Sequence, residues 1–422
     1  MNELLPPVRI ECPDREVRRT LEYIDRFWRK IVKKSPPYTQ GELFYLPYPY
    51  VVPGGMFQQL FYWDSYFIIL GLKIFQFHRL AKGIVENFFY EMTRFGIIPN
   101  SSELAHLSRS QPPFLTSMIR AVWDRDMEWL KKAFEIAKIE YHEVWMNPRT
   151  HYHADTGLNK YYDNLPGMLS VKGEAYLHLD EVYIPPRFWQ ERIEAESGWD
   201  YTGRFNRQCG YYLPVDLNAL LYKYETDFLH FSKILGHENE GQQWKERALL
   251  RKQRIDRYLW NDQEGTYFDY DFVRQRQNRY HSLAAFSPLW SKAASPYQAQ
   301  RIAQRLPMFL YPGGVVTSTV RSGFQWDYPN GWAPLQWVVA KGLQNYRYEK
   351  ESRIITERWV RLCTKMFLQH GKLFEKYNVV DFNIQTAGRY PLQEGFGWTN
   401  AIYTKFAVEF LGCRIDKKAP ID

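Results

Sequence analysis

Carboxylic acids set among aromatic rings and turn residues are the feature of this sequence best suited to chemistry. They occur in three stretches, which read PGGMFQQLFYWDSYFIILGL over 53–72, QWDYPNGWAPLQ over 325–336 and YPLQEGFGWTN over 390–400. Aromatic rings can cover the apolar faces of a pyranose, and a carboxylate accepts hydrogen bonds from its hydroxyl groups. The pattern therefore favours a sugar site. The alternative for the first stretch is a core helix with an acidic N-cap, Asp64.

Six carboxylic acids in the motif loops are candidates for acid–base chemistry. A glycosidic bond is hydrolysed by two carboxyl groups, one that protonates the leaving oxygen and one that activates water or attacks directly. Spacing along the chain does not give the distance between any two of them. The candidates are Asp64, Glu196, Asp200, Asp327, Glu375 and Glu394.

Taken in order, the motifs resemble those of the trehalases, glycoside hydrolases of family 37. The run PGG-x-F followed by YWDSY, and the run QWDYPNGWAP, are similar to the two signature stretches of that family. Hydrolases of glucosylglycerate and mannosylglycerate share the fold and several of the motifs. The resemblance spans roughly residues 45–410, and its other motifs are RSQPPF at 109–114, ESGWD at 196–200, EKY at 375–377 and GFGWTN at 395–400.

The resemblance implies a catalytic pair. Asp200 matches the family's general acid, and the neighbouring Trp199 is an apolar group of the kind that raises a carboxyl pKa and retains the proton near neutral pH. Glu375 matches the general base, which in an inverting enzyme deprotonates water without forming a covalent intermediate. From the residues alone, Asp200 could instead cap a helix, and Glu375 could be a solvated acid paired with Lys376.

A larger set of residues matches the substrate-binding positions of the family. Asp64 and Asp327 are expected to bind sugar hydroxyls. Arg109, the arginine of RSQPPF, is expected to donate hydrogen bonds to sugar hydroxyls through its rigid guanidinium group. The rings are expected to wall the pocket, although any one of them could belong to the core, and the arginine could form a surface ion pair. The predicted substrate-binding residues are Phe57, Tyr62, Trp63, Asp64, Asn100, Arg109, Gln111, Trp326, Asp327, Asn330, Trp332, Arg389, Gln393, Phe396 and Trp398.

Three departures from the family pattern leave the substrate open. Met56 stands where the family usually has arginine, and Arg389 stands where it commonly has glutamate. The stretch over 165–176 replaces a proline-arginine-proline-glutamate motif, and Lys172 or Glu174 are candidates to substitute for it. The catalytic pair matches, so hydrolysis of a glucoside is better supported than the choice of trehalose.

Arg389 is the departure with the clearest chemical consequence. An arginine cannot accept a hydrogen bond, but its guanidinium fits a carboxylate in bidentate fashion. If Arg389 faced the pocket, an acidic aglycone such as glycerate would be favoured. The alternatives are that its side chain points to solvent or pairs with Glu394.

Apolar residues at helical spacing predict a mostly helical chain. Asp14 is a predicted N-cap for a first helix, Asp216 for a helix over 213–235, and Gly412 is a predicted C-cap for the last helix. A hairpin with short strands is predicted over 260–272. The other predicted helices cover the segment after the first motif and residues 81–95, 115–141, 236–260, 280–306, 332–347, 350–370 and 399–411.

Periodicity alone indicates only helices of about 10–20 residues. The resemblance to the trehalases implies a more specific all-α architecture, the (α/α)6 barrel, a toroid whose long loops form the active-site pocket. No Gly/Ser linker or shift in composition divides the chain. We therefore expect a single catalytic domain over 1–422 with a short irregular N-terminal arm over about 1–13.

Composition excludes several other classes of protein. The net charge of +8 is spread over helical segments with acids interleaved, so we expect a solvated surface and no nucleic-acid partner. The N-terminus lacks the apolar core of a signal peptide, and no apolar run is long enough to span a membrane. No spacing typical of metal ligands and no cofactor or phosphate-binding motif is present. The cysteines lack a CxxC pair and are expected to be reduced thiols in a cytoplasmic protein: Cys12, Cys209, Cys363 and Cys413.

The favoured hypothesis is an inverting glycoside hydrolase that converts α,α-trehalose and water into two glucose molecules. The second hypothesis applies the same acid–base pair to glucosylglycerate, mannosylglycerate or a related acidic glycoside. The third is a sugar-binding toroid that has lost catalysis, and the presence of both Asp200 and Glu375 argues against it. In each case the partner is a small disaccharide or glycoside, and the sequence does not indicate an oligomeric state.

Overall fold

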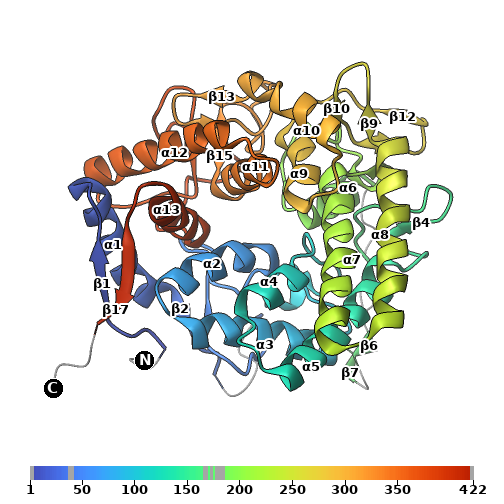
Figure 1. Ribbon diagram of the computed structural model, residues 1–422, viewed down its shortest axis with the longest axis horizontal. Helices are drawn as coiled ribbons and strands as arrows, with labels where there is room; N and C mark the ends of the chain where they lie inside the picture. The colour runs from blue at the N-terminus through green and yellow to red at the C-terminus, as the bar shows by residue number, and fades with distance from the viewer. Residues whose placement is uncertain (1–3, 37–41, 165–169, 172–173, 176–185, 419–422) are drawn as a thin grey trace.

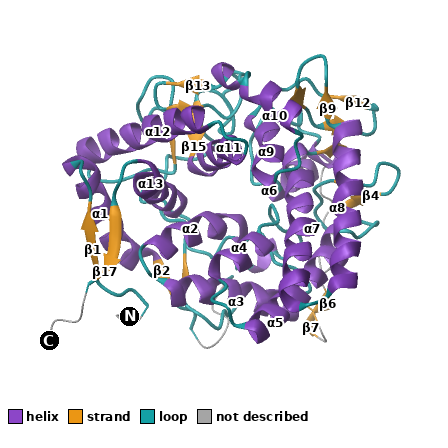
Figure 2. Ribbon diagram, viewed as in Figure 1, coloured by secondary structure: helices purple, strands orange, loops and turns teal. Residues whose placement is uncertain are grey.

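The computed structural model describes residues 4–36, 42–164, 170–171, 174–175 and 186–418 of the chain. Helices make up most of its regular structure, as Figure 2 shows. In chain order the α-helices are α1 (Arg15–Ile31), α2 (Tyr62–Ile74), α3 (His78–Phe95), α4 (Leu115–Val122), α5 (Met127–Ile139), α6 (Pro186–Glu196), α7 (Val215–Leu235), α8 (Glu238–Tyr258), α9 (Ser287–Ser291), α10 (Pro296–Ala303), α11 (Ala333–Asn345), α12 (Glu349–His370) and α13 (Gly397–Phe410).

Six of these helices form a closed inner ring. Each contacts the next in the order α2, α4, α7, α9, α11 and α13, and α13 contacts α2 again, so the ring is complete (Figure 1). Helices α1, α3, α5, α8 and α12 pack against the outside of this ring. This double ring is the (α/α)6 barrel, and the predicted all-α fold class is confirmed.

Burial differs between the two rings as the sequence pattern requires. Helix α1 in the outer ring buries one stripe that includes Leu21, Ile24 and Trp28, and the rest of its surface is polar. Helix α2 in the inner ring buries residues on nearly every side, because it is surrounded by other helices. A Cβ atom at Gly71 of α2 would lie 2.6 Å from the Cα atom of Ala401 in α13. Because Gly71 has no side chain, helices α2 and α13 can pack closely at this point.

Strands are short and scattered around the barrel. Most contain two residues and pair with one neighbour, and the largest described sheet has three strands, β12, β11 and β8. The strands are β1 (Val8–Glu11), β2 (Val32–Lys33), β3 (Tyr50–Val51), β4 (Tyr152–His153), β5 (Leu158–Asn159), β6 (Ser170–Val171), β7 (Glu174–Ala175), β8 (Tyr212–Leu213), β9 (Trp260–Asn261), β10 (Thr266–Tyr267), β11 (Tyr270–Asp271), β12 (Arg276–Gln277), β13 (Leu310–Tyr311), β14 (Gly314–Val315), β15 (Asn330–Trp332), β16 (Lys376–Asn378) and β17 (Arg414–Lys417).

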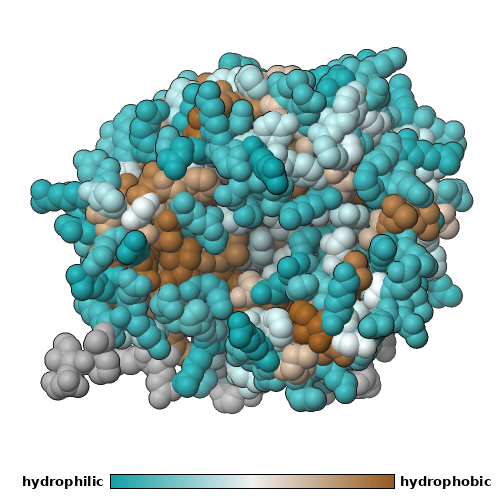
Figure 3. Space-filling model, in the orientation of Figure 1, coloured by the Kyte–Doolittle hydropathy of each residue, from teal (hydrophilic) through white to brown (hydrophobic). Residues whose placement is uncertain are grey.

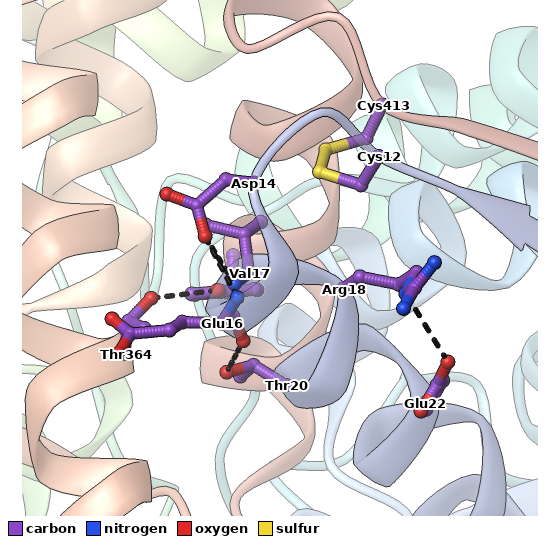
Figure 4. Close-up of a disulfide and its surroundings, with 10 residues drawn as sticks. Cys12, Asp14, Glu16, Val17, Arg18, Thr20, Glu22, Thr364 and Cys413 are labelled. Atoms are coloured by element: carbon purple, nitrogen blue, oxygen red, sulfur yellow. Dashed lines mark hydrogen bonds and ion pairs between the residues drawn. A yellow bond between two sulfur atoms is a disulfide. The ribbon is translucent and has the colours of Figure 1, made fainter.

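The two ends of the chain are joined, which the sequence analysis did not predict. Strand β1 pairs antiparallel with β17, so the prediction of an irregular arm is wrong for residues 8–11. A disulfide links Cys12 to Cys413 beside this pair (Figure 4), and the prediction of reduced thiols is wrong for these two cysteines. Cys209 and Cys363 are buried and free. Because disulfides persist mainly in oxidising compartments, the bridge removes one of the arguments for a cytoplasmic location, which stays a prediction.

Most of the predicted helix starts and turns are present, with three exceptions. Asp14 caps α1 by accepting hydrogen bonds from the backbone N–H groups of Glu16 and Val17 (Figure 4), and the predicted hairpin is formed by β9 and β10. Asp216 does not cap α7, because its carboxylate is bound by Arg204. The cap residue of α13 is Leu411, one residue before the predicted Gly412. The predicted helix over 280–306 is broken into a 3-10 turn, α9 and α10.

The visible surface is mostly hydrophilic. On the face drawn in Figure 3, apolar residues gather to the left of centre, where α2 and α13 lie in Figure 1. None of the helices in the described part of the chain is long and apolar enough to cross a membrane. The same residues contain no group of three or more His, Cys, Asp or Glu side chains that could hold a metal ion.

Candidate active site

A cavity of about 330 Å³ lies at the N-terminal ends of the inner helices, and we call it the front cavity. Trp63 and Asp64 reach it from the first turn of α2, Trp332 from the residue before α11, and Trp398 from the first turn of α13. Twelve predicted site residues line it: Phe57, Trp63, Asp64, Asn100, Arg109, Gln111, Asp200, Trp326, Trp332, Glu375, Phe396 and Trp398.

Four carboxyl groups line the front cavity, and three of them, Asp64, Asp200 and Glu375, lie near one another. Asp64 and Glu375 are 4% and 1% exposed, and Asp200 lines the same space. Burial raises the pKa of all three, because a carboxylate loses its hydration there. The neighbouring charge of Glu375, and then that of Asp200, further raises the pKa of Asp64. The cavity therefore holds acids that retain protons at higher pH than free carboxyls do.

Glu375 is held by two side chains. It directly precedes β16, which pairs antiparallel with β15, so Glu375 lies beside Trp332 at the end of β15. Lys376 Nζ is 2.7 Å from its Oε2 atom, and the Tyr390 hydroxyl donates to its Oε1 atom at 2.6 Å. Both contacts favour the ionised carboxylate and oppose the rise in pKa that burial causes. Glu375 is thus paired with Lys376, but both are buried and neither is a solvated surface acid or base.

Lys376 is itself fixed by aromatic rings. Its ammonium group lies 4.8 Å from the centre of the Trp332 ring and 4.9 Å from that of the Tyr390 ring. The faces of such rings attract a cation, so the two contacts stabilise the positive charge of Lys376. This charge in turn favours the ionised form of Glu375. The base position is therefore built by one cation, one hydroxyl and two rings.

Asp200 follows α6 through a tight turn. Gly198 in this turn has a φ of 71°, and a Cβ atom there would lie 2.8 Å from the Trp63 ring, so only glycine fits. The next residue, Trp199, is buried and stacks on Trp326 with ring centres 5.6 Å apart. Gln325 Nε2 donates to the carboxylate of Asp200 at 3.0 Å. Asp200 is therefore oriented by a neutral amide, whereas a cation contacts Glu375.

The aromatic walls of the front cavity form one continuous cluster. Trp326 and Trp332 are stacked with ring centres 3.9 Å apart and planes 4° apart. Trp63 contacts Trp326 at 5.7 Å, and Trp398 contacts Trp332 at 5.8 Å. Phe396 continues the cluster at 4.7 Å from Trp398. Each ring fixes its neighbours, so the cavity presents preformed apolar faces of the kind that pack against a sugar ring.

Polar residues of the loop over 97–114 complete the wall. Arg109 is 7% exposed and lies 3.5 Å from Asp163, which rules out the alternative of a surface ion pair. Its Nε atom is buried and has no hydrogen-bond partner among the described residues. Gln111 Oε1 accepts a hydrogen bond from the backbone N–H of Trp63, which joins this loop to the start of α2.

The family model for the trehalases matches residues 6–410. The chain belongs to the trehalase family. It is 33% identical to neutral trehalase Nth1 from Saccharomyces cerevisiae, with a TM-score of 0.75, over 90% of this chain and 78% of that one. A family GH63 mannosylglycerate hydrolase from Thermus thermophilus, solved with Tris and D-glycerate, is 17% identical with a TM-score of 0.62, over 92% of this chain and 100% of that one. This second likeness shows the shared fold alone. As a member of the trehalase family, the chain is a glycoside hydrolase.

Five predicted site residues do not line the front cavity of this trehalase-family enzyme, and two of them are structural. Tyr62 is fully buried, and its hydroxyl is 2.8 Å from Glu140 in the layer beneath. Asp327 is also fully buried, and it accepts hydrogen bonds from the backbone N–H of Gly203 at 2.9 Å and from the Tyr280, Ser318 and Ser322 hydroxyls. Asp327 thereby links the loop that follows Asp200 to the loop in which Asp327 itself lies. The prediction that Asp327 binds sugar hydroxyls in the pocket is therefore corrected.

The other three lie behind or outside the cavity wall. Asn330 is fully buried and donates to the backbone carbonyls of Gln325 and Ala387. Gln393 accepts a hydrogen bond from the backbone N–H of Met56, at 2.8 Å. Arg389 is exposed, although its charge is near enough to lower the pKa of Asp200. It does not pair with Glu394, which forms an ion pair with Lys372.

The front cavity also contains residues that the sequence analysis missed. They include Tyr390 beside Glu375, and Gln59, Phe61, Glu103 and His106 at the side formed by the loop over 97–114. Burial, with the charges of Arg109 and Arg192, lowers the pKa of His106 to about 3, so its ring is neutral. A signal for Tyr390 was present, since it begins the third aromatic stretch. Lys172 and the side chain of Glu174, candidates for the missing family motif, lie outside the described residues.

Proposed function

We propose that the protein is an inverting trehalase that hydrolyses α,α-trehalose to two glucose molecules. The observation that carries this proposal is the unequal support of two carboxyl groups in one buried, ring-lined cavity. Glu375 is contacted by a cation and a hydroxyl, which suits a base that must be ionised. Asp200 forms no ion pair among the described residues, and burial raises its pKa, which suits an acid that must keep its proton.

The reaction needs no group beyond these two acids and a water molecule. Asp200 donates its proton to the glycosidic oxygen as the bond to the anomeric carbon breaks. Glu375 takes a proton from a water molecule on the opposite face, and the water oxygen bonds to the same carbon with inverted configuration. The proton from Asp200 leaves on the released sugar, Glu375 carries the proton taken from water, and exchange with solvent restores both groups. We expect their carboxyl groups to lie roughly 6.5–9.5 Å apart, the separation that leaves room for this water.

Asp64 is proposed to bind the substrate without taking part in proton transfer. It lies in the same cavity as the acid and the base, and the charges of both raise its pKa. It is carried on the first turn of a rigid inner helix. A carboxyl group in this position can hold sugar hydroxyls in a fixed orientation, while the tryptophan cluster packs against the apolar faces of the ring.

Two substitutions and one stereochemical measurement test the proposal. Asp200→Asn and Glu375→Gln should each lower kcat for trehalose by at least about a hundredfold, with the fold checked by circular dichroism. Proton NMR of freshly formed product should show β-glucose from the sugar that water attacks, because inversion converts its α linkage. Near-normal kcat in either variant would make that assignment wrong. Early product containing only α-glucose would contradict inversion.

An acidic glycoside remains the second candidate substrate, on the basis of Arg389. The family commonly has glutamate at this position. The side chain of Arg389 is exposed, and it does not pair with Glu394, which pairs with Lys372. A carboxylate-bearing aglycone that extended out of the front cavity would meet this cation. Comparing kcat/KM for trehalose, glucosylglycerate and mannosylglycerate decides between the two candidates, because the same acid–base pair would act on all three.

A further inference from the structure

A second cavity, of about 620 Å³, lies further along the inner ring, and we call it the rear cavity. It is lined from five inner helices, α2, α4, α7, α9 and α11. On α2 it begins at Tyr66, one turn beyond the residues that line the front cavity. On α9 and α11 it reaches Lys292, the C-terminal cap residue, and Asn345, the last helical residue. The two cavities thus occupy successive levels of the same ring.

Four cations line the rear cavity, opposed by one carboxylate. Asp227 is fully buried, and its Oδ1 atom is 2.6 Å from Arg120 Nη1 and also in contact with Lys223 Nζ. Lys292 and Lys341 line the cavity too, and neither has a carboxylate within ion-pair distance among the described residues. Four positive charges therefore face one negative charge.

The neighbouring acid does not remove this excess of positive charge. Glu409 lies near Lys341, but its carboxylate is 2.6 Å from Lys405, so the two charges cancel. Burial lowers the pKa of Lys341, and the charges of Lys405 and Lys292 lower it further, against the opposing charge of Glu409. Burial also lowers the pKa of Lys223, with Asp227 opposing and Arg120 adding to the effect. An anion in the rear cavity would relieve this repulsion between cations.

Helix dipoles explain part of the arrangement. Cations are stabilised at helix C-termini, where Arg120 on α4 and Lys292 after α9 are found, whereas Lys341 lies before the last turn of α11. Lys223 lies in the interior of α7, where that effect has faded. Helix dipoles also do not explain why an open cavity lies between these cations.

Aromatic rings and hydrogen-bond donors line the rear cavity between the cations. Tyr66, Trp290 and Trp337 line the rear cavity, and the Trp290 ring lies 6.0 Å from the Tyr66 ring at a steep angle. The Nε1 atom of Trp337 is buried, and Trp337 lies close enough to the Tyr66 hydroxyl to oppose the rise in pKa that burial causes there. Ring faces beside polar donors suit a molecule with a sugar ring as well as a charge. The volume also lies within the range of small-molecule sites.

We propose that the rear cavity binds a small phosphorylated sugar, with its phosphate between Lys292 and Lys341 and its ring against Trp290 and Trp337. A phosphate group carries up to two negative charges near neutral pH and binds lysine and arginine strongly. The front cavity, lined by four carboxyl groups and one arginine, is less suited to the same ligand. This site is independent of the proposed hydrolysis, so either proposal can fail without the other.

Calorimetric titration with glucose 6-phosphate tests the site, with glucose and inorganic phosphate titrated separately. The key variant is Lys292→Gln with Lys341→Gln, because neither lysine leaves an unpaired carboxylate when its charge is removed. Binding of glucose 6-phosphate should weaken by at least about tenfold, since charge-assisted contacts to phosphate are lost. The matched control is Lys245→Gln with Lys350→Gln, two exposed lysines on the outer helices α8 and α12. Thermal melting of both double variants checks the fold.

The possible outcomes distinguish binding in the rear cavity from a general effect of positive charge and from binding of phosphate alone. Binding that weakens in the cavity variant and not in the control supports the proposal. Absence of binding, binding unchanged in the cavity variant, or an equal loss in both double variants would overturn it. If inorganic phosphate binds as tightly as glucose 6-phosphate, the rings contribute nothing and the sugar part of the proposal is wrong.

Discussion

The front and rear cavities are built from the same inner helices but carry opposite charges. The front cavity takes its carboxyl groups from loops and first turns, with Glu375 and Asp200 both outside the helices. The rear cavity takes its cations from helical positions and helix ends. Because inner helices point their N-termini at the front cavity, backbone N–H groups there favour negative charge, and the opposite ends favour cations. The orientation of the inner helices therefore determines which end of the ring favours carboxylates and which end favours cations.

The two cavities also differ in how completely their charges are compensated. In the front cavity Lys376 lies against Glu375, and three contacting tryptophan rings line the same cavity as the carboxyls. In the rear cavity Lys292 and Lys341 lack such partners among the described residues. The front cavity is thus organised for proton transfer at fixed positions, whereas the rear cavity is organised for binding an anion.

The largest effect is expected from Lys376→Gln. Lys376 lowers the pKa of Glu375 and, less directly, that of Asp200. Without it Glu375 stays protonated to higher pH, so the acidic limb of kcat/KM should move upward by about one pH unit or more. The basic limb, set by Asp200, should move in the same direction. The pH profile measures both limbs. Lys372→Gln, whose partner Glu394 is outside the front cavity, is the control, and an unmoved acidic limb would contradict the prediction.

Tyr390→Phe should have the next largest effect. It removes one hydrogen bond to the carboxylate of Glu375 and keeps the ring that packs against Lys376. Loss of a hydrogen bond to a charged group corresponds to about tenfold or more in kcat, with little change in KM because Tyr390 acts through the base. The control is Tyr346→Phe, which removes a hydroxyl that donates to the backbone of Ala294 far from the front cavity. Equal losses in both variants would indicate a structural effect only.

In the rear cavity, Asp227→Asn should strengthen anion binding. The change removes the one carboxylate beneath the four cations and raises the excess of positive charge. Glucose 6-phosphate should bind severalfold more tightly, an effect on the order of one charge acting across a partly solvated site. The melting temperature should fall, because Arg120 and Lys223 lose their partner. Titration at two salt concentrations is the measurement, and weaker binding in this variant would count against the rear cavity as the anion site.

Local signals in the sequence predicted most of the helices, and the motifs that resemble those of the trehalases predicted most of the front cavity. The cap at Asp14 and the stripe of α1 depend on neighbours within one helix, so spacing was enough to identify them. The disulfide joins residues 401 positions apart, and β1 pairs with β17 from the opposite end of the chain, which no local pattern records. Asp64 and Asp327 show the same limit within the site. Both follow a tryptophan, yet one lines the cavity and the other is consumed by hydrogen bonds from distant loops.

The smallest effect is expected from Arg389→Glu, which tests whether the edge of the front cavity selects the substrate. Arg389 is exposed and absent from the cavity wall, so the ratio of kcat/KM for trehalose to that for glucosylglycerate should change by less than about threefold, the scale of a solvent-exposed ion pair. Its charge does lower the pKa of Asp200. Reversing that charge should raise this pKa, keep the acid protonated to higher pH, and move the basic limb slightly upward.

The control for this last variant is Arg19→Glu, an equal change of charge at an exposed position on α1. It should leave both the selectivity and the basic limb unchanged. A shift toward trehalose of about tenfold or more in Arg389→Glu would have a different meaning, because an effect of that size requires a charge-assisted contact with the substrate. Arg389 would then bind an acidic aglycone directly, and the second candidate substrate would replace trehalose.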